Sequence, residues 1–162
     1  PVPMNAMSAP GLQPQQLQPQ QFQLQQPGAP ATPENYDAVA VPDWAKAWKH
    51  YRWEEAKEAW EKRDSLFIDA RGQSEYDQAH IPGAISMPVS DFDASYKKYE
   101  SKIKAAKHLI TYCHGVGCQL SNKVAQKLWN DKGYRNVGSF FGGWPQWQEH
   151  HMPVESGPEP KR

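Results

Sequence analysis

The sequence has few of the features that would tie it to a membrane, a nucleic acid or a disulfide framework. Its 162 residues hold 18 basic and 18 acidic side chains, which give a formal net charge of zero, and the two signs are mixed along the chain. Without a basic stripe, nothing favours the tracking of nucleic-acid phosphates. No apolar run approaches the roughly 20 residues that span a bilayer, and no secretory signal is present.

Cysteine is scarce as well. The two cysteines, Cys113 and Cys118, are too few for a disulfide scaffold. They lie close together in a glycine-rich stretch, where one short-range disulfide would constrain almost nothing. Reactivity explains this placement better than a structural bridge does, and two incidental thiols are the alternative.

The first forty or so positions are nearly free of charge and rich in Gln and Pro. We therefore predict a disordered linker or tail over 1–42, an ordered domain over 43–157 and a short C-terminal tail over 158–162. A linker of this kind favours a tethered, exported or periplasmic domain, with a cytoplasmic one as the alternative. Because the chain begins at Pro1 rather than at a methionine, we expect either a mature form or a piece of something longer, and membrane contact only through a missing or fused segment.

Strand-like and helix-like patterns alternate through the ordered part. Apolar residues recur at helical spacing from Trp44 to Tyr51, with Asp43 as a plausible N-cap, and predict a first helix there. Further helices are expected at 53–62, 74–79, 121–129 and 144–150, and strands at 66–69, 84–87, 108–112 and 137–141. This alternation predicts an α/β fold with a central, mostly parallel sheet and helices on both faces.

A cysteine follows the clearest buried strand, in the stretch TYCHGVGCQLSNKVAQKL. Functional sites of such folds lie at the carboxyl ends of the strands, which is where this order places Cys113. The glycines allow a tight turn that points N–H groups inward, and the following helix adds the positive end of its dipole. The loop is expected to stabilise a thiolate or a persulfide on Cys113, which suits attack on another sulfur.

Two further segments, FIDARGQSEYDQAHIPGAISMP and GYRNVGSFFGGWPQWQEHHMPVE, resemble the early and closing signatures of the rhodanese family. The resemblance runs from about Tyr51 to Glu155. It implies a rhodanese-like fold and a sulfurtransferase in which Cys113 takes a sulfane sulfur from a donor such as thiosulfate or a persulfide. The cysteine then passes the sulfur to cyanide or to a small or protein thiol.

The resemblance also assigns residues around Cys113. The active-site loop comprises His114, Gly115, Val116, Gly117, Cys118, Gln119, Leu120 and Ser121. Asp69, Arg71, Glu75 and His80 match signature positions that we expect to be structural. Arg71 and Glu75 are expected to pair across a tight turn, and His80 to pin the turn at Pro82. Trp144 and Trp147 are expected to pack in the core or at the pocket rim.

The loop departs from the commoner family pattern. It is about three residues longer, carries a second cysteine as in one branch of the family, and has no Arg or Lys between Cys113 and Ser121. A dianion such as thiosulfate usually meets a cation, so this loop disfavours thiosulfate as the physiological donor. It also disfavours phosphatase or arsenate-reductase chemistry, because Gln119 stands where those enzymes place an arginine.

Cys118 is open to three interpretations: a resolving thiol, a second sulfur carrier, or a side chain that only packs against the loop. A metal site is not expected, since two cysteines and His114 would need a distant fourth ligand. The enzyme hypothesis needs no cofactor, and we expect a monomer without nucleic-acid partners. The rival hypothesis is a tethered rhodanese-like module for protein interaction or redox sensing that uses the Cys113/Cys118 dithiol.

Overall fold

The structure is a computed structural model and describes residues 40–162. The linker predicted over 1–42 therefore lies almost entirely outside the described residues. The elements run in the order η3 (Asp43–Ala45), β1 (Lys49–Tyr51), α1 (Trp53–Glu61), β2 (Ser65–Asp69), α2 (Gln73–Gln78), β3 (Ile85–Ser86), η4 (Val89–Asp91), α3 (Phe92–Ala105), β4 (His108–Tyr112), α4 (Leu120–Asn130), β5 (Val137–Phe140) and α5 (Gly143–Glu149).

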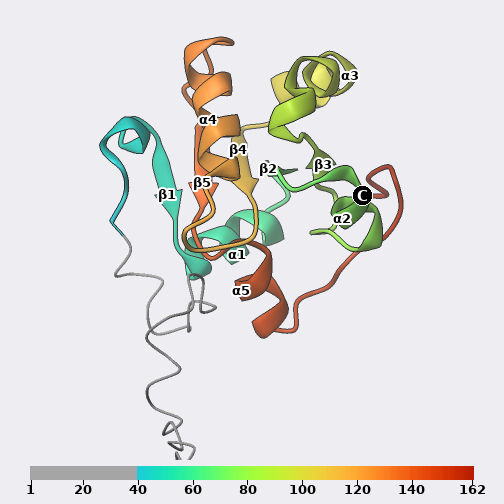
Figure 1. The fold of residues 1–162 in the computed structure, drawn as a ribbon. Helices are drawn as coiled ribbons and strands as arrows, with labels where there is room; N and C mark the ends of the chain where they lie inside the picture. Colours follow the sequence, from blue (N-terminus) through green and yellow to red (C-terminus); the bar gives the residue numbers. More distant parts are fainter. Residues whose placement is uncertain (1–39) are drawn as a thin grey trace, which may run out of the picture.

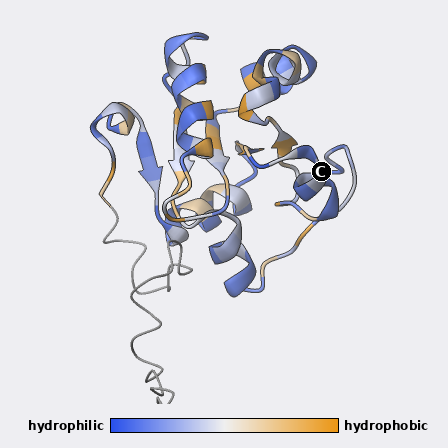
Figure 2. Ribbon diagram, in the orientation of Figure 1, coloured by the Kyte–Doolittle hydropathy of each residue, from blue (hydrophilic) through white to orange (hydrophobic). Residues whose placement is uncertain are grey.

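All five strands pair in parallel, in the order β1-β5-β4-β2-β3 (Figure 1). The central strand β4 pairs with β2 along its whole length, with Ile110 opposite Phe67. This arrangement confirms the predicted α/β fold. Figure 2 shows the edge strand β1 in hydrophilic colours, whereas hydrophobic colour gathers on the inner strands and the helix sides that cover them.

Each face of the sheet has its own hydrophobic core, because alternate side chains of a strand point to opposite faces. On one face, Leu109 of β4 packs in a cluster with side chains of α3 and α4. On the other face, Ile110 and Tyr112 pack with side chains of α1, α2 and α5, including the fully buried Trp147. Helices cover both faces, as the sequence predicts.

The predicted helix from Asp43 to Tyr51 is wrong. Its first turn is the short 3-10 helix η3, but Lys49–Tyr51 form strand β1 and pair with β5. The helical spacing of the aromatic residues has a different origin: Trp48 is buried in one core and Tyr51 in the other, on opposite faces of the sheet. Residues 49–51 form a strand rather than a helix because the edge of β5 offers them backbone hydrogen bonds.

Helix α3, Phe92–Ala105, was not among the expected elements. Its buried residues Phe92, Ser95, Tyr99 and Ile103 follow helical spacing. The many charged residues between them account for its low mean hydropathy, which makes the pattern easy to overlook. The helix crosses from β3 back to β4 and covers one face of the sheet (Figure 1).

The last residues return along the domain. Glu155 forms an isolated bridge with His80, Glu159 accepts a hydrogen bond from Tyr99, and the guanidinium of Arg162 lies 4.0 Å from the ring centre of Trp60. The domain boundary at 157 stays a prediction. No helix within residues 40–162 is long and apolar enough to cross a membrane.

Candidate active site

Cys113 stands directly after the last residue of β4, at the carboxyl edge of the sheet. The loop that follows enters α4 at Leu120, one residue earlier than the sequence pattern suggests. The Cys113 residue is only 2% exposed, so its thiol lies beneath the loop rather than on the surface. The strand, loop and helix predicted from the sequence are therefore present, with the cysteine where functional sites of such folds lie.

Glycines allow the loop to pack tightly against the start of α5. Gly115 and Gly143 have φ angles of +96° and +54°. A Cβ atom on Gly143 would lie 2.5 Å from the Cys113 carbonyl oxygen and 2.8 Å from the Gly115 nitrogen. The Trp144 N–H donates to that same carbonyl at 2.9 Å. The double glycine of the closing signature thus holds the backbone of the cysteine in place.

The Cys113 thiol faces the beginning of α4. Its Sγ lies 3.4 Å from Ser121 Oγ and 3.6 Å from the Cys118 carbonyl oxygen. The hydrogen bond with the Cys118 side chain, and then burial, raise the pKa of Cys113, whereas the hydroxyl and the N–H of Ser121 lower it. In the resting loop Cys113 is therefore the protonated thiol.

Cys118 carries the negative charge of the pair. The hydrogen bond with Cys113 lowers the pKa of Cys118 to about 5, against the effect of partial burial, and the N–H groups of Leu120 and His114 add to this. The expectation of a thiolate on Cys113 thus differs from the resting geometry, in which the inward-pointing N–H groups serve both sulfur atoms. Both cysteines are free thiols.

His114 connects Cys118 to a carboxylate. Its Nε2 lies 2.6 Å from Glu75 Oε1, and its Nδ1 lies 3.8 Å from Cys118 Sγ. Burial alone would lower the pKa of His114, but the hydrogen bond with Glu75 outweighs burial and raises it. Glu75, His114 and Cys118 thus form a row of side chains that leads from α2 into the loop.

The expected pair of Arg71 and Glu75 is not formed. Arg71 instead makes a buried ion pair with Asp69, with 2.7 Å between Nη2 and Oδ2, and its guanidinium lies 4.5 Å from the ring centre of Trp144. Arg71 pairs with Asp69 because the Asp69 carboxylate is buried and needs a charged partner. Glu75 is partly exposed and pairs with His114 instead. The expectation that these residues are structural stays a prediction.

His80 does not hydrogen-bond to the turn at Pro82. Its Nδ1 lies 2.7 Å from the Tyr76 carbonyl oxygen, one turn earlier in the chain, and its ring stacks on that of Tyr76. Its Nε2 lies 3.5 Å from Glu155. The Pro82 carbonyl instead accepts a hydrogen bond from Trp60. His80 thus contacts α2 and the C-terminal segment.

The remaining loop residues differ in exposure. Gly115 and Ser121 are buried, His114 and Gly117 are exposed, and Val116, Gln119 and Leu120 lie between these extremes. The side chain of Gln119 turns toward Asn122 and accepts a hydrogen bond from it at 3.2 Å. Gln119 is therefore occupied by a contact within the loop and the first turn of α4.

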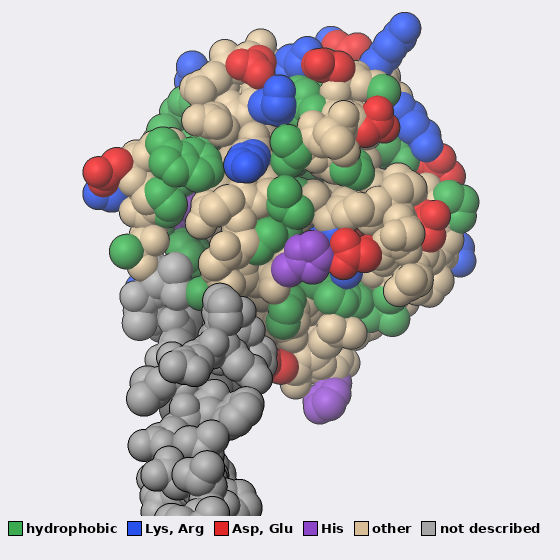
Figure 3. All heavy atoms as spheres, in the orientation of Figure 1, with side chains coloured by type: hydrophobic (Ala, Val, Ile, Leu, Met, Phe, Trp, Pro, Cys, Tyr) green, Lys and Arg blue, Asp and Glu red, His purple; other side chains and the backbone are tan. Residues whose placement is uncertain are grey.

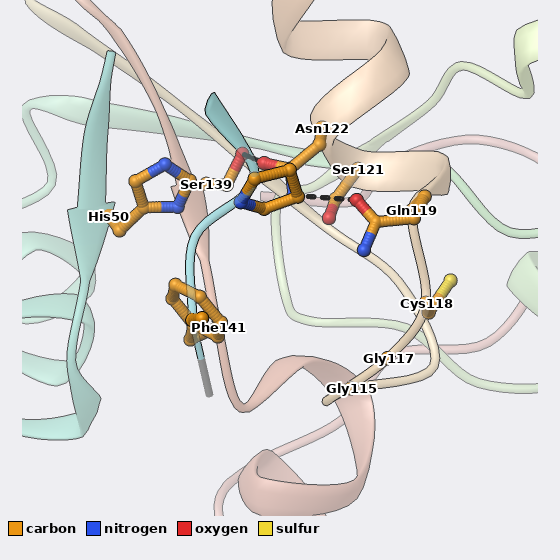
Figure 4. Close-up of a pocket in the computed structure, with 11 residues that line it drawn as sticks. His50, Gly115, Gly117, Cys118, Gln119, Ser121, Asn122, Ser139 and Phe141 are labelled. Atoms are coloured by element: carbon orange, nitrogen blue, oxygen red, sulfur yellow. Dashed lines mark hydrogen bonds between the residues drawn. The ribbon is translucent and has the colours of Figure 1, made fainter. Parts of the chain in front are cut away.

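A small pocket of about 20 Å³ opens between the loop, the start of α4 and strands β1 and β5 (Figure 4), with room for about one water molecule. Sequence reasoning missed six of its lining residues: Ala40, Pro42, His50, Asn122, Ser139 and Phe141. Ser139 donates to Asn122 at 2.9 Å, and His50 Nδ1 is buried with no hydrogen-bond partner among residues 40–162. Only the position of Asn122, next to the loop, could have indicated its place.

Acidic and basic side chains are interspersed on the face drawn in Figure 3. Within the described part of the chain, no group of three or more His, Cys, Asp or Glu residues is placed to hold a metal ion.

The fold and the site place this protein among α/β domains with a parallel sheet, in which a glycine-rich loop after the central strand holds a cysteine. The profile of the rhodanese-like domain matches residues 52–150, which is more than half of the chain. The protein therefore belongs to the rhodanese-like family. The finer resemblance to a branch with a second loop cysteine stays a prediction.

Individual relatives agree with this assignment. The chain is 36% identical over 98 residues to the thiosulfate sulfurtransferase GlpE of Coxiella burnetii, a match that covers 58% of this chain and 84% of the relative. It is 35% identical over 98 residues to a tRNA uridine(34) hydroxylase of Staphylococcus haemolyticus, covering 59% of this chain but 29% of that protein. A crystal structure of a Bacillus halodurans protein aligns with a TM-score of 0.58 at 25% identity, over 69% of this chain and 79% of the other. Together the family and the first relative support sulfurtransferase activity.

Proposed function

We propose that this domain is a sulfurtransferase in which Cys113 carries sulfane sulfur as a persulfide. The observation that carries the proposal is the placement of the Cys113 sulfur, which faces Ser121 in the first turn of α4. The free N–H groups and the dipole of a helix N-terminus stabilise negative charge. A persulfide anion on Cys113 extends into the same field.

The dithiol supplies the proton transfer that the first step needs. Cys113 attacks the sulfane sulfur of the donor, and its proton passes to the neighbouring Cys118 thiolate, since the two cysteines titrate together and the pKa of Cys118 is the lower one. The donor's bond breaks, and it leaves as sulfite from thiosulfate or as a thiolate from a persulfide. A thiol or cyanide then attacks the outer sulfur of the Cys113 persulfide and regenerates the Cys113 thiolate.

The charges near the loop favour a persulfide-type donor over thiosulfate. The segment from Cys113 to Ser121 contains no Arg or Lys, and its histidine, His114, is already paired with the Glu75 carboxylate at 2.6 Å. A dianion would enter this site with no unpaired cation in the loop to receive it. The GlpE relative is named for thiosulfate, so thiosulfate remains the comparison donor in any assay.

The proximity of the two cysteines, with Cys113 Sγ 3.6 Å from the Cys118 carbonyl oxygen, favours a second candidate function, a redox-sensing interaction module that uses the Cys113/Cys118 dithiol. The two functions differ in one respect: a sensor forms only a disulfide under oxidant, whereas a sulfurtransferase gains sulfur from a donor and passes it on.

Intact mass of reduced protein after brief treatment with a low-molecular-weight persulfide distinguishes them. Cys118→Ser, which retains Cys113 but lacks the proton acceptor, should gain one sulfur, about 32 Da, more slowly than the wild type, and lose it again when cyanide is added. Cys113→Ser should gain nothing. If Cys118→Ser takes up no sulfur even when the treatment is prolonged, the proposed function is wrong.

A further inference from the structure

Cys118, the second cysteine of the loop, has a histidine and a carboxylate beside it. His114 Nδ1 faces the Cys118 sulfur at 3.8 Å, and His114 Nε2 is bound to Glu75 at 2.6 Å. Glu75 comes from α2, and 39 positions separate it from His114. A carboxylate that orients an imidazole, which in turn faces a nucleophile, is the arrangement that activates nucleophiles in many enzymes. A cysteine that only packs against the loop has no use for such partners.

The first sulfur-transfer step leaves Cys113 as a persulfide and Cys118 as a protonated thiol. The backbone of Cys118 lies next to the inner sulfur of that persulfide, since the Cys118 carbonyl oxygen is 3.6 Å from Cys113 Sγ, and the glycines of the loop let the Cys118 thiol turn toward it. His114 is the neighbouring base that takes the Cys118 proton. Glu75 and Cys118 are the titratable groups that act on His114, and Cys113 acts on Cys118. Arg71 acts on this row through Glu75, whose pKa it lowers.

We propose that Cys118 is a resolving thiol and that His114, oriented by Glu75, carries its proton, so that the domain releases the sulfur of the Cys113 persulfide as hydrosulfide. This inference rests on the proposed function, because it begins from a persulfide on Cys113. It extends that function from sulfur transfer to the reduction of sulfane sulfur.

The step balances without an outside oxidant. His114 removes the proton of Cys118, and the thiolate attacks Cys113 Sγ. A bond forms between the two cysteine sulfurs, and the bond between Cys113 Sγ and the outer sulfur breaks. The outer sulfur leaves with the electron pair and takes the proton from His114, so it departs as hydrosulfide. The sulfane sulfur is reduced by two electrons, and the two cysteines are oxidised to a disulfide, which a dithiol reductant then reopens.

The test uses the full, reduced chain with one equivalent of a low-molecular-weight persulfide and no other thiol. We expect the wild type to release about one hydrosulfide per chain, on the stoichiometry of the exchange, and to lose both thiols to a Cys113–Cys118 disulfide. Cys118→Ser should release none and should hold the extra sulfur on Cys113. Peptide mapping locates the disulfide in one case and the persulfide in the other.

His114→Asn tests the proton carrier. Loss of an acid–base group should slow hydrosulfide release on the order of 10²-fold. The burst rate of the wild type should fall as the pH drops through the raised pKa of His114, because protonated His114 no longer accepts the Cys118 proton. In His114→Asn the rate should instead keep rising until an ordinary thiol ionises, near about pH 8.5. His150→Asn, a histidine that stacks on Trp53 away from the loop, is the matched control and should behave as wild type.

The two proposals fail in different ways. If the wild type keeps its extra sulfur and releases no hydrosulfide, the resolving role is wrong while Cys113 remains the carrier. If Cys118→Ser takes up no sulfur even on prolonged treatment, the carrier assignment fails and the resolving step fails with it. If His114→Asn keeps both the wild-type burst rate and its pH profile, His114 is not the proton carrier.

Discussion

The side chains of Asp69 and Arg71 form a two-pronged ion pair that is almost fully buried, at the carboxyl end of β2. Arg71 Nε lies 3.0 Å from Asp69 Oδ1, and Nη2 lies 2.7 Å from Oδ2. The same carboxylate accepts a 2.7 Å hydrogen bond from the Tyr112 hydroxyl at the end of β4, while the guanidinium lies over the Trp144 ring. The pair therefore joins the ends of two strands to the helix that holds the active-site loop.

Removal of the guanidinium should be costly. Arg71→Ala leaves the Asp69 carboxylate buried and without its charged partner, and breaking such a pair lowers the free energy of unfolding by about 3–5 kcal/mol. Urea denaturation measures this change. Lys57→Ala, which removes an exposed partner of Glu61, is the control and should cost no more than about 0.5 kcal/mol. Equal effects of the two substitutions would contradict this role of Arg71.

The Tyr112 hydroxyl is buried and makes two hydrogen bonds. It donates to Asp69 and accepts the N–H of Ile81 at 3.2 Å. Tyr112→Phe keeps the ring but leaves two buried groups without this partner, so the free energy of unfolding should fall by about 1–3 kcal/mol. The decrease should be smaller when Tyr112→Phe is made in Arg71→Ala, because both changes act on Asp69. Strict additivity in this double-mutant cycle would show that the two contacts are independent.

Gly143 is expected to control the shape of the active-site loop. In Gly143→Ala the new methyl group would overlap the Cys113 carbonyl and the Gly115 nitrogen, so the loop must move and sulfur transfer should fall at least tenfold. Gly133→Ala is the control: its φ of +78° is also left-handed, but nothing lies within 4 Å of the added atom. This control should lose about 1–2 kcal/mol of stability from strain alone and keep its activity. Equal transfer rates in both variants would show that the contact with Gly143 does not shape the site.

The ionisation of Cys118 should be visible in its rate of alkylation by iodoacetamide, because the thiolate is the reacting form. The rate should fall as the pH drops through about 5, whereas an ordinary thiol would do so near about 8.5. Cys113→Ala should raise this midpoint further than His114→Asn does, since the hydrogen bond with Cys113 contributes most to the shift. Quantitative peptide mapping gives the rate at each pH. A wild-type midpoint near 8.5 would contradict the assignment of the charge to Cys118.

The features that sequence could predict are local ones. The strand before Cys113 is an apolar, partly β-branched run that ends at a glycine-rich loop. The order of strand, loop and helix can therefore be predicted from the sequence alone. The signature segments then place Asp69, Arg71 and the double glycine at Gly142 in the same domain.

The features that sequence could not predict depend on long-range contacts. Lys49–Tyr51 become a strand because β5 offers them a free edge, and no local pattern reports that edge. The contact of Glu75 with His114 joins residues on different elements. Arg71 pairs with Asp69 rather than with Glu75 because Asp69 is buried, and the sequence does not report that burial. Which of two neighbouring thiols holds the charge is likewise set by the interaction between the two cysteines, and then by N–H groups, and only the folded loop brings these together.

The central claim, that Cys113 carries the transferred sulfur, is tested most directly by the rate of sulfur transfer from a persulfide or thiosulfate donor to cyanide. Wild type and Cys113→Ser should be compared at equal concentration, after their melting temperatures show that both are folded. The account predicts that Cys113→Ser falls to the rate measured without protein. Transfer by Cys113→Ser at the wild-type rate would contradict it.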